Sequence, residues 1–226
     1  MIKNILFDLD DTLFDFKMAE RVALSKALLS LGIEPTEHII KRYSEINISQ
    51  WKLLELGELT REQVKVNRYK LLFDELGLDL SPQKATAVYE DNLCIGHYFI
   101  DGAEDIIKTL YDKNYNLYLV SNGAKRVQDS RLKSSGISKY FKGIFISEVV
   151  GYEKPSIKFF EYCFDRIEHF NTEETILVGD SLSSDIKGGA NAGIKTVWFN
   201  PKHAVNTTQI IPTYEINRLS QIMKYI

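Results

Sequence analysis

Short runs of consecutive, mostly apolar residues recur along the chain, each bounded by polar positions. The first spans residues 5–7, and four more follow at residues 117–120, 144–146, 176–178 and 196–199. Unbroken apolar runs, rather than alternating ones, are typical of strands that are buried on both faces of a parallel sheet. The pattern therefore predicts five strands in one such sheet.

Segments with helical periodicity accompany the last four runs. Residues 102–113 place Ile106, Ile107, Leu110 and Tyr111 on one face, and Asp101 precedes them as the expected N-cap. Further helices are predicted at residues 126–135, 157–168, 184–191 and 217–226. Strand–helix units that repeat in this way predict an α/β fold with a doubly wound parallel sheet.

The stretch between the first two strands shows no convincing strand but is rich in helix signals. Thr60 and Gln63, for example, form a capping box. Three glycines stand where helices are expected to end, at Gly32, Gly57 and Gly77. We therefore predict a four-helix insert at residues 17–96, within a core made of residues 1–16 plus 97–226.

Composition and charge narrow the classes of function. The 226 residues are 44% hydrophobic with a formal net charge of -3, which suits a folded chain with a sizeable core. A mildly acidic chain is a poor ligand for nucleic acid polymers or anionic membranes. No run approaches the ~20 apolar residues of a membrane span, and Asp8, Asp10 and Asp11 stand where a signal peptide needs apolar residues. We therefore expect a cytoplasmic protein, monomeric or weakly dimeric, that binds neither nucleic acid polymers nor membranes.

The first predicted strand runs directly into an acidic segment that contains Asp8, Asp10 and Asp11. Residues two apart in extended chain point the same way, so Asp8 and Asp10 can converge on one site. Clustered acids repel one another unless a cation or protons offset their charge. A solvated turn is the alternative interpretation. A ligand site is favoured, because open α/β sheets bind ligands at the carboxyl ends of their strands.

Polar residues follow three of the other predicted strands. Ser121 and Asn122 come after the second, Lys154 after the third, and Asp180 and Asp185 after the fourth. Each alone has an ordinary explanation as a turn residue or a surface charge. Together, at one edge of a parallel sheet, they predict a site for an anion and a cation.

Clustered carboxylates suit Mg²⁺, and Mn²⁺ or Co²⁺ could replace it because all three accept oxygen ligands. A phosphate monoester needs an in-line nucleophile, charge neutralisation and a proton for the leaving oxygen. Asp8 is the predicted nucleophile and Asp10 the predicted acid and base. Asp180 would hold the metal directly, and Asp185 would act through water or by orienting Lys154.

Three further groups would hold the transferring phosphoryl group: the Ser121 hydroxyl, the Asn122 backbone and the Lys154 ammonium. The predicted substrate is therefore a small phosphate monoester. A nucleotide-sized anion is compatible with the charge of the chain.

In order and spacing, four segments resemble the four motifs of the haloacid dehalogenase-like hydrolase superfamily: residues 8–12, 121–123, 154–155 and 179–185. The resemblance covers the whole chain and implies a Rossmann-like core. It implies phosphorylation of the first aspartate, acid/base chemistry by the second, and metal contacts from Asp8, the Asp10 carbonyl and Asp180. The helical insert is similar to the superfamily's type 1 cap, which covers the site.

Within the superfamily, the chain resembles bacterial pyrimidine 5′-nucleotidases that clear modified nucleotides. The supporting segments are residues 47–51, 57–60 with 68, 122–123 with 131–132, and 146–151. This resemblance implies UMP, dUMP, dTMP and their analogues as substrates, with Asn47, Trp51 and Arg68 as base or ribose contacts. Helix packing for Trp51 and a surface charge for Arg68 are the alternative interpretations.

Three other functions compete. A 2-haloacid dehalogenase would share the fold and the Asp8 nucleophile, but it needs neither a metal nor an acid at Asp10. A phosphoglycolate or sugar-phosphate phosphatase, or a mutase, would carry the same motifs. A scaffold protein on an inactive fold should have lost acids that this chain retains.

Overall fold

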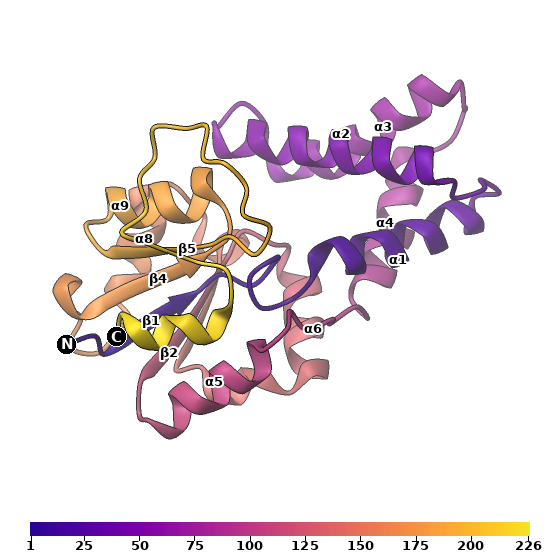
Figure 1. Ribbon diagram of the computed structural model, residues 1–226. Helices are drawn as coiled ribbons and strands as arrows, with labels where there is room; N and C mark the ends of the chain where they lie inside the picture. The colour runs from indigo at the N-terminus through magenta and orange to yellow at the C-terminus, as the bar shows by residue number, and fades with distance from the viewer. The chain divides into compact units, whose positions relative to one another are not determined.

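The computed structural model describes residues 1–226, which divide into two compact units. The core unit comprises Met1–Phe16 and His97–Ile226, and the helical unit comprises Lys17–Gly96 (Figure 1). The chain therefore leaves the core unit after its first strand and returns to it for the remaining strands.

Six parallel strands form the sheet of the core unit, in the order β3-β2-β1-β4-β5-β6. Along the chain they are β1 (Asn4–Phe7), β2 (Asn116–Ser121), β3 (Gly143–Ile146), β4 (Thr175–Gly179), β5 (Lys195–Phe199) and β6 (Tyr214–Ile216). β1 lies between β2 and β4, where Phe7 stands opposite Leu119 and Val178. The five predicted strands are confirmed, and β6 is an additional edge strand beside β5.

The helices of the core unit are short. They are α5 (Ala103–Asp112), α6 (Lys125–Ser135), α7 (Ser147–Val150), α8 (Ile157–Phe164) and α9 (Lys187–Asn191). A π-helical turn, η3 (Leu182–Ile186), runs directly into α9, and 3-10 turns occur at η1 (Ile137–Tyr140), η2 (Thr172–Glu174) and η4 (Leu219–Lys224). The doubly wound α/β class predicted from the sequence is confirmed.

Several helix details differ from the sequence-based expectation. The helix expected at residues 217–226 is the 3-10 turn η4, and Tyr111 of α5 is exposed. The N-cap of α5 is Gly102 rather than Asp101, and its φ of 74° is one that glycine adopts without strain. α8 ends at Phe164 instead of at residue 168. The helix expected from residue 184 begins two residues earlier, at Leu182.

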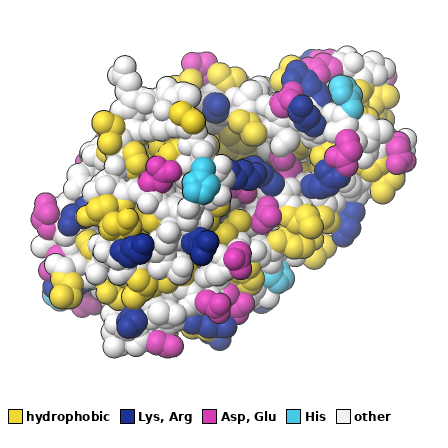
Figure 2. Space-filling model, viewed as in Figure 1, with side chains coloured by type: hydrophobic (Ala, Val, Ile, Leu, Met, Phe, Trp, Pro, Cys, Tyr) yellow, Lys and Arg dark blue, Asp and Glu magenta, His cyan; other side chains and the backbone are white.

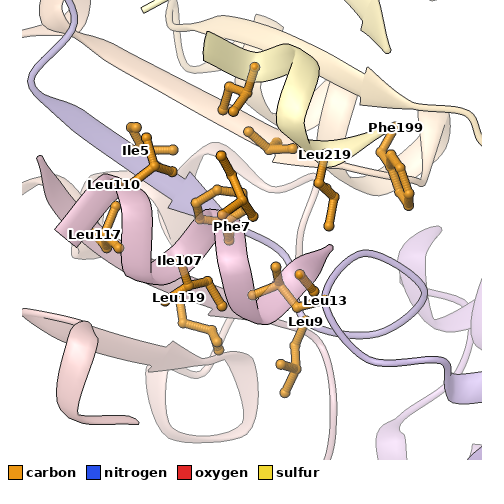
Figure 3. Packing of buried hydrophobic residues seen from close by; sticks show 14 of the residues in the cluster. Ile5, Phe7, Leu9, Leu13, Ile107, Leu110, Leu117, Leu119, Phe199 and Leu219 are labelled. Carbon is orange, nitrogen blue, oxygen red and sulfur yellow. The ribbon is translucent and has the colours of Figure 1, made fainter. Parts of the chain in front are cut away.

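The two faces of the sheet bury different side chains of the same strand. On β1, Ile5 and Phe7 join a cluster with Ile107 of α5 and Leu219 of η4 (Figure 3). Leu6 belongs instead to a second buried cluster that includes Phe159 and Phe160 of α8. Because both faces are covered, the middle of each central strand is apolar, and polar groups are found at the strand ends.

The helical unit contains four helices: α1 (Phe16–Ser30), α2 (Glu37–Glu55), α3 (Arg61–Leu76) and α4 (Pro82–Leu93). These four helices lie between β1 and β2, in the stretch where the sequence predicts a four-helix insert. At the start of α3, the Thr60 hydroxyl accepts a hydrogen bond from the Gln63 backbone at 3.3 Å, and the Gln63 side chain accepts one from the Thr60 backbone at 2.8 Å. This is the capping box predicted from the sequence.

The distribution of surface charge and the character of the helices agree with the composition of the chain. Basic and acidic side chains are interspersed on the face drawn in Figure 2, in keeping with a net charge of -3. None of the helices combines the length and the apolar character that a membrane span requires.

Candidate active site

The carboxyl ends of β1, β2 and β4 lie side by side, because these strands are parallel neighbours. Asp8 directly follows β1, and its backbone N–H donates to the Val178 carbonyl at 2.9 Å, which extends the ladder by one bond. Ser121 is the last residue of β2, and Asp180 directly follows β4. The sheet therefore brings Asp8, Ser121 and Asp180, all predicted site residues, to one edge.

Lys154 is the centre of the buried part of the site. Its Nζ donates to Asp8 Oδ1 at 2.6 Å, to Asp185 Oδ1 at 2.7 Å and to the Val120 carbonyl at 2.9 Å. An ammonium group has three protons, and these three acceptors use all of them. The side chain is 1% exposed, so it serves as a fixed internal cation rather than as a surface charge.

Asn122 positions the backbone of this lysine. Its Nδ2 donates to the Lys154 carbonyl, its Oδ1 accepts from the Lys154 N–H, and both distances are 2.9 Å. A reciprocal amide pair of this kind fixes the segment that carries Lys154 against the end of β2. The Asn122 side chain therefore has a structural partner, a role that the sequence did not indicate.

Three carboxylates could hold a metal ion. Asp8, Asp180 and Asp185 each offer an oxygen, and these oxygens lie within 4.8 Å of one another. The Trp198 indole N–H donates to the Asp180 carbonyl at 2.8 Å, and the Ser181 N–H donates to Asp185 Oδ2 at 3.1 Å. The three carboxylates can carry more negative charge than one lysine neutralises. Oxygen ligands of this kind suit a divalent cation such as Mg²⁺.

A glycine makes room for one of these carboxylates. A Cβ at Gly179 would lie 2.3 Å from Asp185 Oδ2, closer than real Cβ contacts allow. Glycine at the end of β4 therefore lets Asp185 approach the backbone beside Asp180. This close approach explains why the segment 179–185 begins with glycine.

The site perturbs the pKa of its own groups. Burial raises the pKa of Asp8 to about 8; Lys154 opposes this rise, and the Asp185 and Asp10 carboxylates add to it. Burial alone would lower the pKa of Lys154, but Asp185 and Asp8 outweigh it, and its pKa is raised above the ordinary value. A nucleophilic Asp8 must be ionised near neutral pH, and a neighbouring divalent cation would favour that form.

Asp10 is held by two side chains of α6. Arg131 NH1 donates to Asp10 Oδ1 at 2.5 Å, and Gln128 Nε2 donates to Asp10 Oδ2 at 2.6 Å. Gln128 Nε2 also lies 2.9 Å from the Ser121 hydroxyl oxygen, which accepts from the Gly123 N–H at 3.1 Å. The predicted acid/base and the predicted phosphate-binding hydroxyl therefore share one amide donor.

Sequence reasoning did not give Gln128 or Arg131 a function, although a signal existed. Both lie on the buried face of α6, which also carries Val127 and Leu132. Polar side chains at positions of a helix that packs against a core are uncommon and are usually paired. Their spacing of three residues places them one above the other on the same face.

The three cap candidates also lie together, within the helical unit. Asn47 Oδ1 accepts from Trp51 Nε1 at 3.0 Å and from Arg68 NH1 at 3.2 Å, and Asn47 Nδ2 donates to Glu20 Oε1 at 2.6 Å. The Arg68 guanidinium lies 4.6 Å from the ring centre of Tyr89 and is buried. The interpretation of Arg68 as a surface charge is therefore wrong. Glu20 is a member of this network that the sequence did not reveal.

The model of the haloacid dehalogenase-like hydrolase family matches residues 5–199. The chain belongs to this family. The match spans the carboxylates, the lysine and the α6 residues described above, and it confirms the family predicted from the four motifs.

Individual relatives agree with this assignment. The HAD-hydrolase YfnB of Bacillus subtilis is 40% identical over 220 residues, which are 97% of this chain and 93% of that protein. Its crystal structure, described as bound to magnesium and as revealing interdomain movement, has a TM-score of 0.94 and covers 99% of this chain and 97% of that one.

Two other relatives carry functional names. The pyrimidine 5′-nucleotidase PynA of Streptococcus pneumoniae is 38% identical over 214 residues, which are 95% of this chain and 90% of that protein. The pyrimidine 5′-nucleotidase YjjG of Escherichia coli is 28% identical over 218 residues, which are 96% of this chain and 95% of that protein. The similarity therefore extends through both units.

Proposed function

We propose that this protein is a magnesium-dependent phosphatase that hydrolyses pyrimidine nucleoside 5′-monophosphates through an aspartyl-phosphate on Asp8. The observation that supports the chemistry best is the position of Asp8. It lies 2.6 Å from the buried Lys154 ammonium, with oxygens of Asp180 and Asp185 within 4.8 Å of its own. A carboxylate nucleophile surrounded by cation sites suits attack on an anionic phosphorus.

In the first step, a carboxylate oxygen of Asp8 bonds to phosphorus as the bond from phosphorus to the leaving oxygen breaks. Asp10 gives its proton to the leaving nucleoside oxygen. In the second step, Asp10 takes a proton from water as the water oxygen attacks phosphorus. The bond between Asp8 and phosphorus then breaks, and inorganic phosphate and the free Asp8 carboxylate result.

The remaining groups would bind rather than react. Asp8, Asp180 and Asp185, with the Asp10 carbonyl, would hold Mg²⁺, which reduces the repulsion between the Asp8 carboxylate and the phosphate. The Ser121 hydroxyl and the Asn122 backbone would hold the non-bridging phosphate oxygens, and Lys154 would join them by exchanging one of its present acceptors for a phosphate oxygen. Mn²⁺ or Co²⁺ could take the place of Mg²⁺, because each accepts oxygen ligands.

Asp10 favours phosphatase over dehalogenase chemistry. A dehalogenase expels a halide ion, which needs no proton, whereas an alkoxide leaving group does need one. Halide displacement requires neither the half-buried carboxyl of Asp10 nor the cluster of three carboxylates. Phosphate ester hydrolysis uses both.

The nucleotide assignment depends on similarity to PynA and YjjG, and on the helical unit. Trp51 is half-buried, while Asn47 and Arg68 are buried against each other. We therefore assign base stacking to the Trp51 ring, and we assign to Asn47 and Arg68 the task of holding that ring. The cytoplasmic location and the monomeric or weakly dimeric state stay predictions.

A panel of phosphate esters tests this function. With Mg²⁺, dUMP and dTMP should be hydrolysed faster than phosphoglycolate or a hexose phosphate, and EDTA should abolish all turnover. Turnover of phosphoglycolate at the same rate or faster would remove the nucleotidase assignment. Halide release from a 2-haloacid in EDTA would contradict the phosphatase chemistry itself.

A further inference from the structure

The Asp10 carboxylate is gripped on both of its oxygens by one helix. Arg131 NH1 lies 2.5 Å from Oδ1, Gln128 Nε2 lies 2.6 Å from Oδ2, and Arg131 NH1 also donates to Gln128 Oε1 at 3.0 Å. The three side chains thus form a closed ring of hydrogen bonds. Gln128 and Arg131 are 1% and 0% exposed, whereas the Asp10 side chain is 26% exposed and so faces an accessible space.

We propose that Gln128 and Arg131 are positioning residues that aim the Asp10 carboxyl at the leaving oxygen. This role rests on the phosphatase function proposed above. An aspartate side chain has two rotatable bonds, and its reactive oxygen must lie within hydrogen-bond reach of the atom it serves. Donors on both oxygens remove that rotational freedom before the substrate arrives.

Gln128 also connects the acid to the phosphate-binding group. Its Nε2 donates to Asp10 Oδ2 and lies 2.9 Å from Ser121 Oγ, so one amide sets the distance between the two. In the proposed reaction the Ser121 hydroxyl contacts the phosphoryl group while Asp10 contacts the leaving oxygen. Because Ser121 and Asp10 share this donor, their positions on the two sides of the breaking phosphorus–oxygen bond are fixed relative to each other.

The surroundings are adapted to this arrangement. A Cβ at Gly123 would lie 2.0 Å from Gln128 Nε2, so only glycine there leaves room for the amide. The Arg131 guanidinium packs 5.1 Å from the ring centre of Phe14, which supports it from the side of the first motif. A fully buried arginine costs folding free energy unless it is well paired, so apolar residues would serve stability alone at least as well.

Leaving groups of different basicity test the role. The alkoxide of dUMP needs a proton from Asp10, whereas p-nitrophenolate is a weak base that leaves without one. kcat/KM reports the steps through phosphoryl transfer to Asp8. In Arg131→Lys, kcat/KM for dUMP should therefore fall about 10- to 100-fold, while that for p-nitrophenyl phosphate falls less than about 3-fold. In Gln128→Ala, which also removes a donor to Ser121, both values should fall, and the loss for dUMP should be about 10-fold larger. Arg131→Lys retains the buried charge but not the guanidinium geometry.

The matched control is Lys133→Ala, which removes an exposed cation from the same helix and should leave both kcat/KM values unchanged. Equal losses for the two esters would identify a general structural role and overturn the proposal, as would unchanged kinetics for dUMP. Circular dichroism and thermal unfolding of each variant separate misfolding from misplacement.

A double-mutant cycle gives an independent reading. Once Asp10→Asn has removed the acid, Arg131→Lys should cause no further loss with dUMP, because there is no acid left to position. Losses that multiply would contradict the proposal. A wild-type protein that releases phosphate from neither ester in Mg²⁺ would overturn the phosphatase function, and with it this role. If the wild type is active, the relative losses of the variants on the two esters decide only whether Gln128 and Arg131 position Asp10.

Discussion

The Lys154 ammonium lies 2.6 Å from Asp8 and 2.7 Å from Asp185, so one buried cation joins the proposed nucleophile to a carboxylate of the proposed metal site. Both carboxylates are themselves buried. The charge balance of the site therefore depends on Lys154 and on any divalent ion that binds. The effects of mutation, pH and metal should be coupled.

Lys154→Met should destabilise the metal-free protein. Removal of the ammonium leaves Asp185 buried without its counter-charge and Asp8 without a hydrogen-bond donor, and loss of one partner of a buried ion pair costs about 3–5 kcal/mol. Urea unfolding in EDTA measures the change in the free energy of unfolding. Lys158→Met, at an exposed position of α8, is the control and should change this free energy by less than about 0.5 kcal/mol. Similar stability of the two variants would contradict the structural role of Lys154.

The pH dependence of stability should reveal the raised pKa of Asp8. From its ordinary value of 3.8 to about 8, the unfolded chain is ionised at this group while the metal-free folded chain is not. The stability contributed by Asp8 is therefore fully present at low pH, declines as the pH rises through this window, and levels off above it. Lys154 has a raised pKa above this window and stays charged throughout.

Urea titrations in EDTA across this pH range test the effect. Relative to wild type, Asp8→Asn should become progressively more stable as the pH rises from about 4 to about 8. Saturating Mg²⁺ should abolish or reverse the trend, because the ion favours the ionised carboxylate. Parallel pH profiles of the two proteins in EDTA would show that Asp8 is ionised without a metal.

Trp51→Ala should impair nucleotide binding more than phosphate chemistry. Base–aromatic stacking contributes about 1–3 kcal/mol, so KM for dUMP should rise about 5- to 150-fold, with little change for p-nitrophenyl phosphate. Trp51→Phe keeps a ring and should retain most of the affinity. Loss of the Asn47 hydrogen bond occurs in both variants, so the pair isolates the ring itself. Equal KM values for dUMP in wild type and Trp51→Ala would remove Trp51 from the substrate site.

Much of the core unit could be predicted from the sequence. Each strand from β1 to β5 contains a mostly apolar run, because both faces of the sheet are covered. β6 has three residues and only Ile216 is buried, so its strand conformation depends on pairing with β5, which no local pattern encodes. The acids and Lys154 could be predicted because they follow strands whose ends must meet.

The contacts of Gln128 and Arg131 could not be predicted in the same way. They approach Asp10 from α6, more than a hundred positions along the chain, and the approach depends on how that helix packs and on the space left by Gly123. Arg68 illustrates the same limit in the helical unit. Its burial depends on the Tyr89 ring, contributed by a different helix.

The most direct measurement is the search for a phosphorylated Asp8. A radiolabelled nucleoside monophosphate is mixed with enzyme and Mg²⁺, quenched in acid within one turnover, and the labelled peptide is identified. The proposed function predicts label on the peptide that contains Asp8, lost on mild alkaline treatment and absent in Asp8→Asn, whose turnover should be abolished. Phosphate release from wild type without a labelled peptide, or substantial turnover by Asp8→Asn, would contradict it.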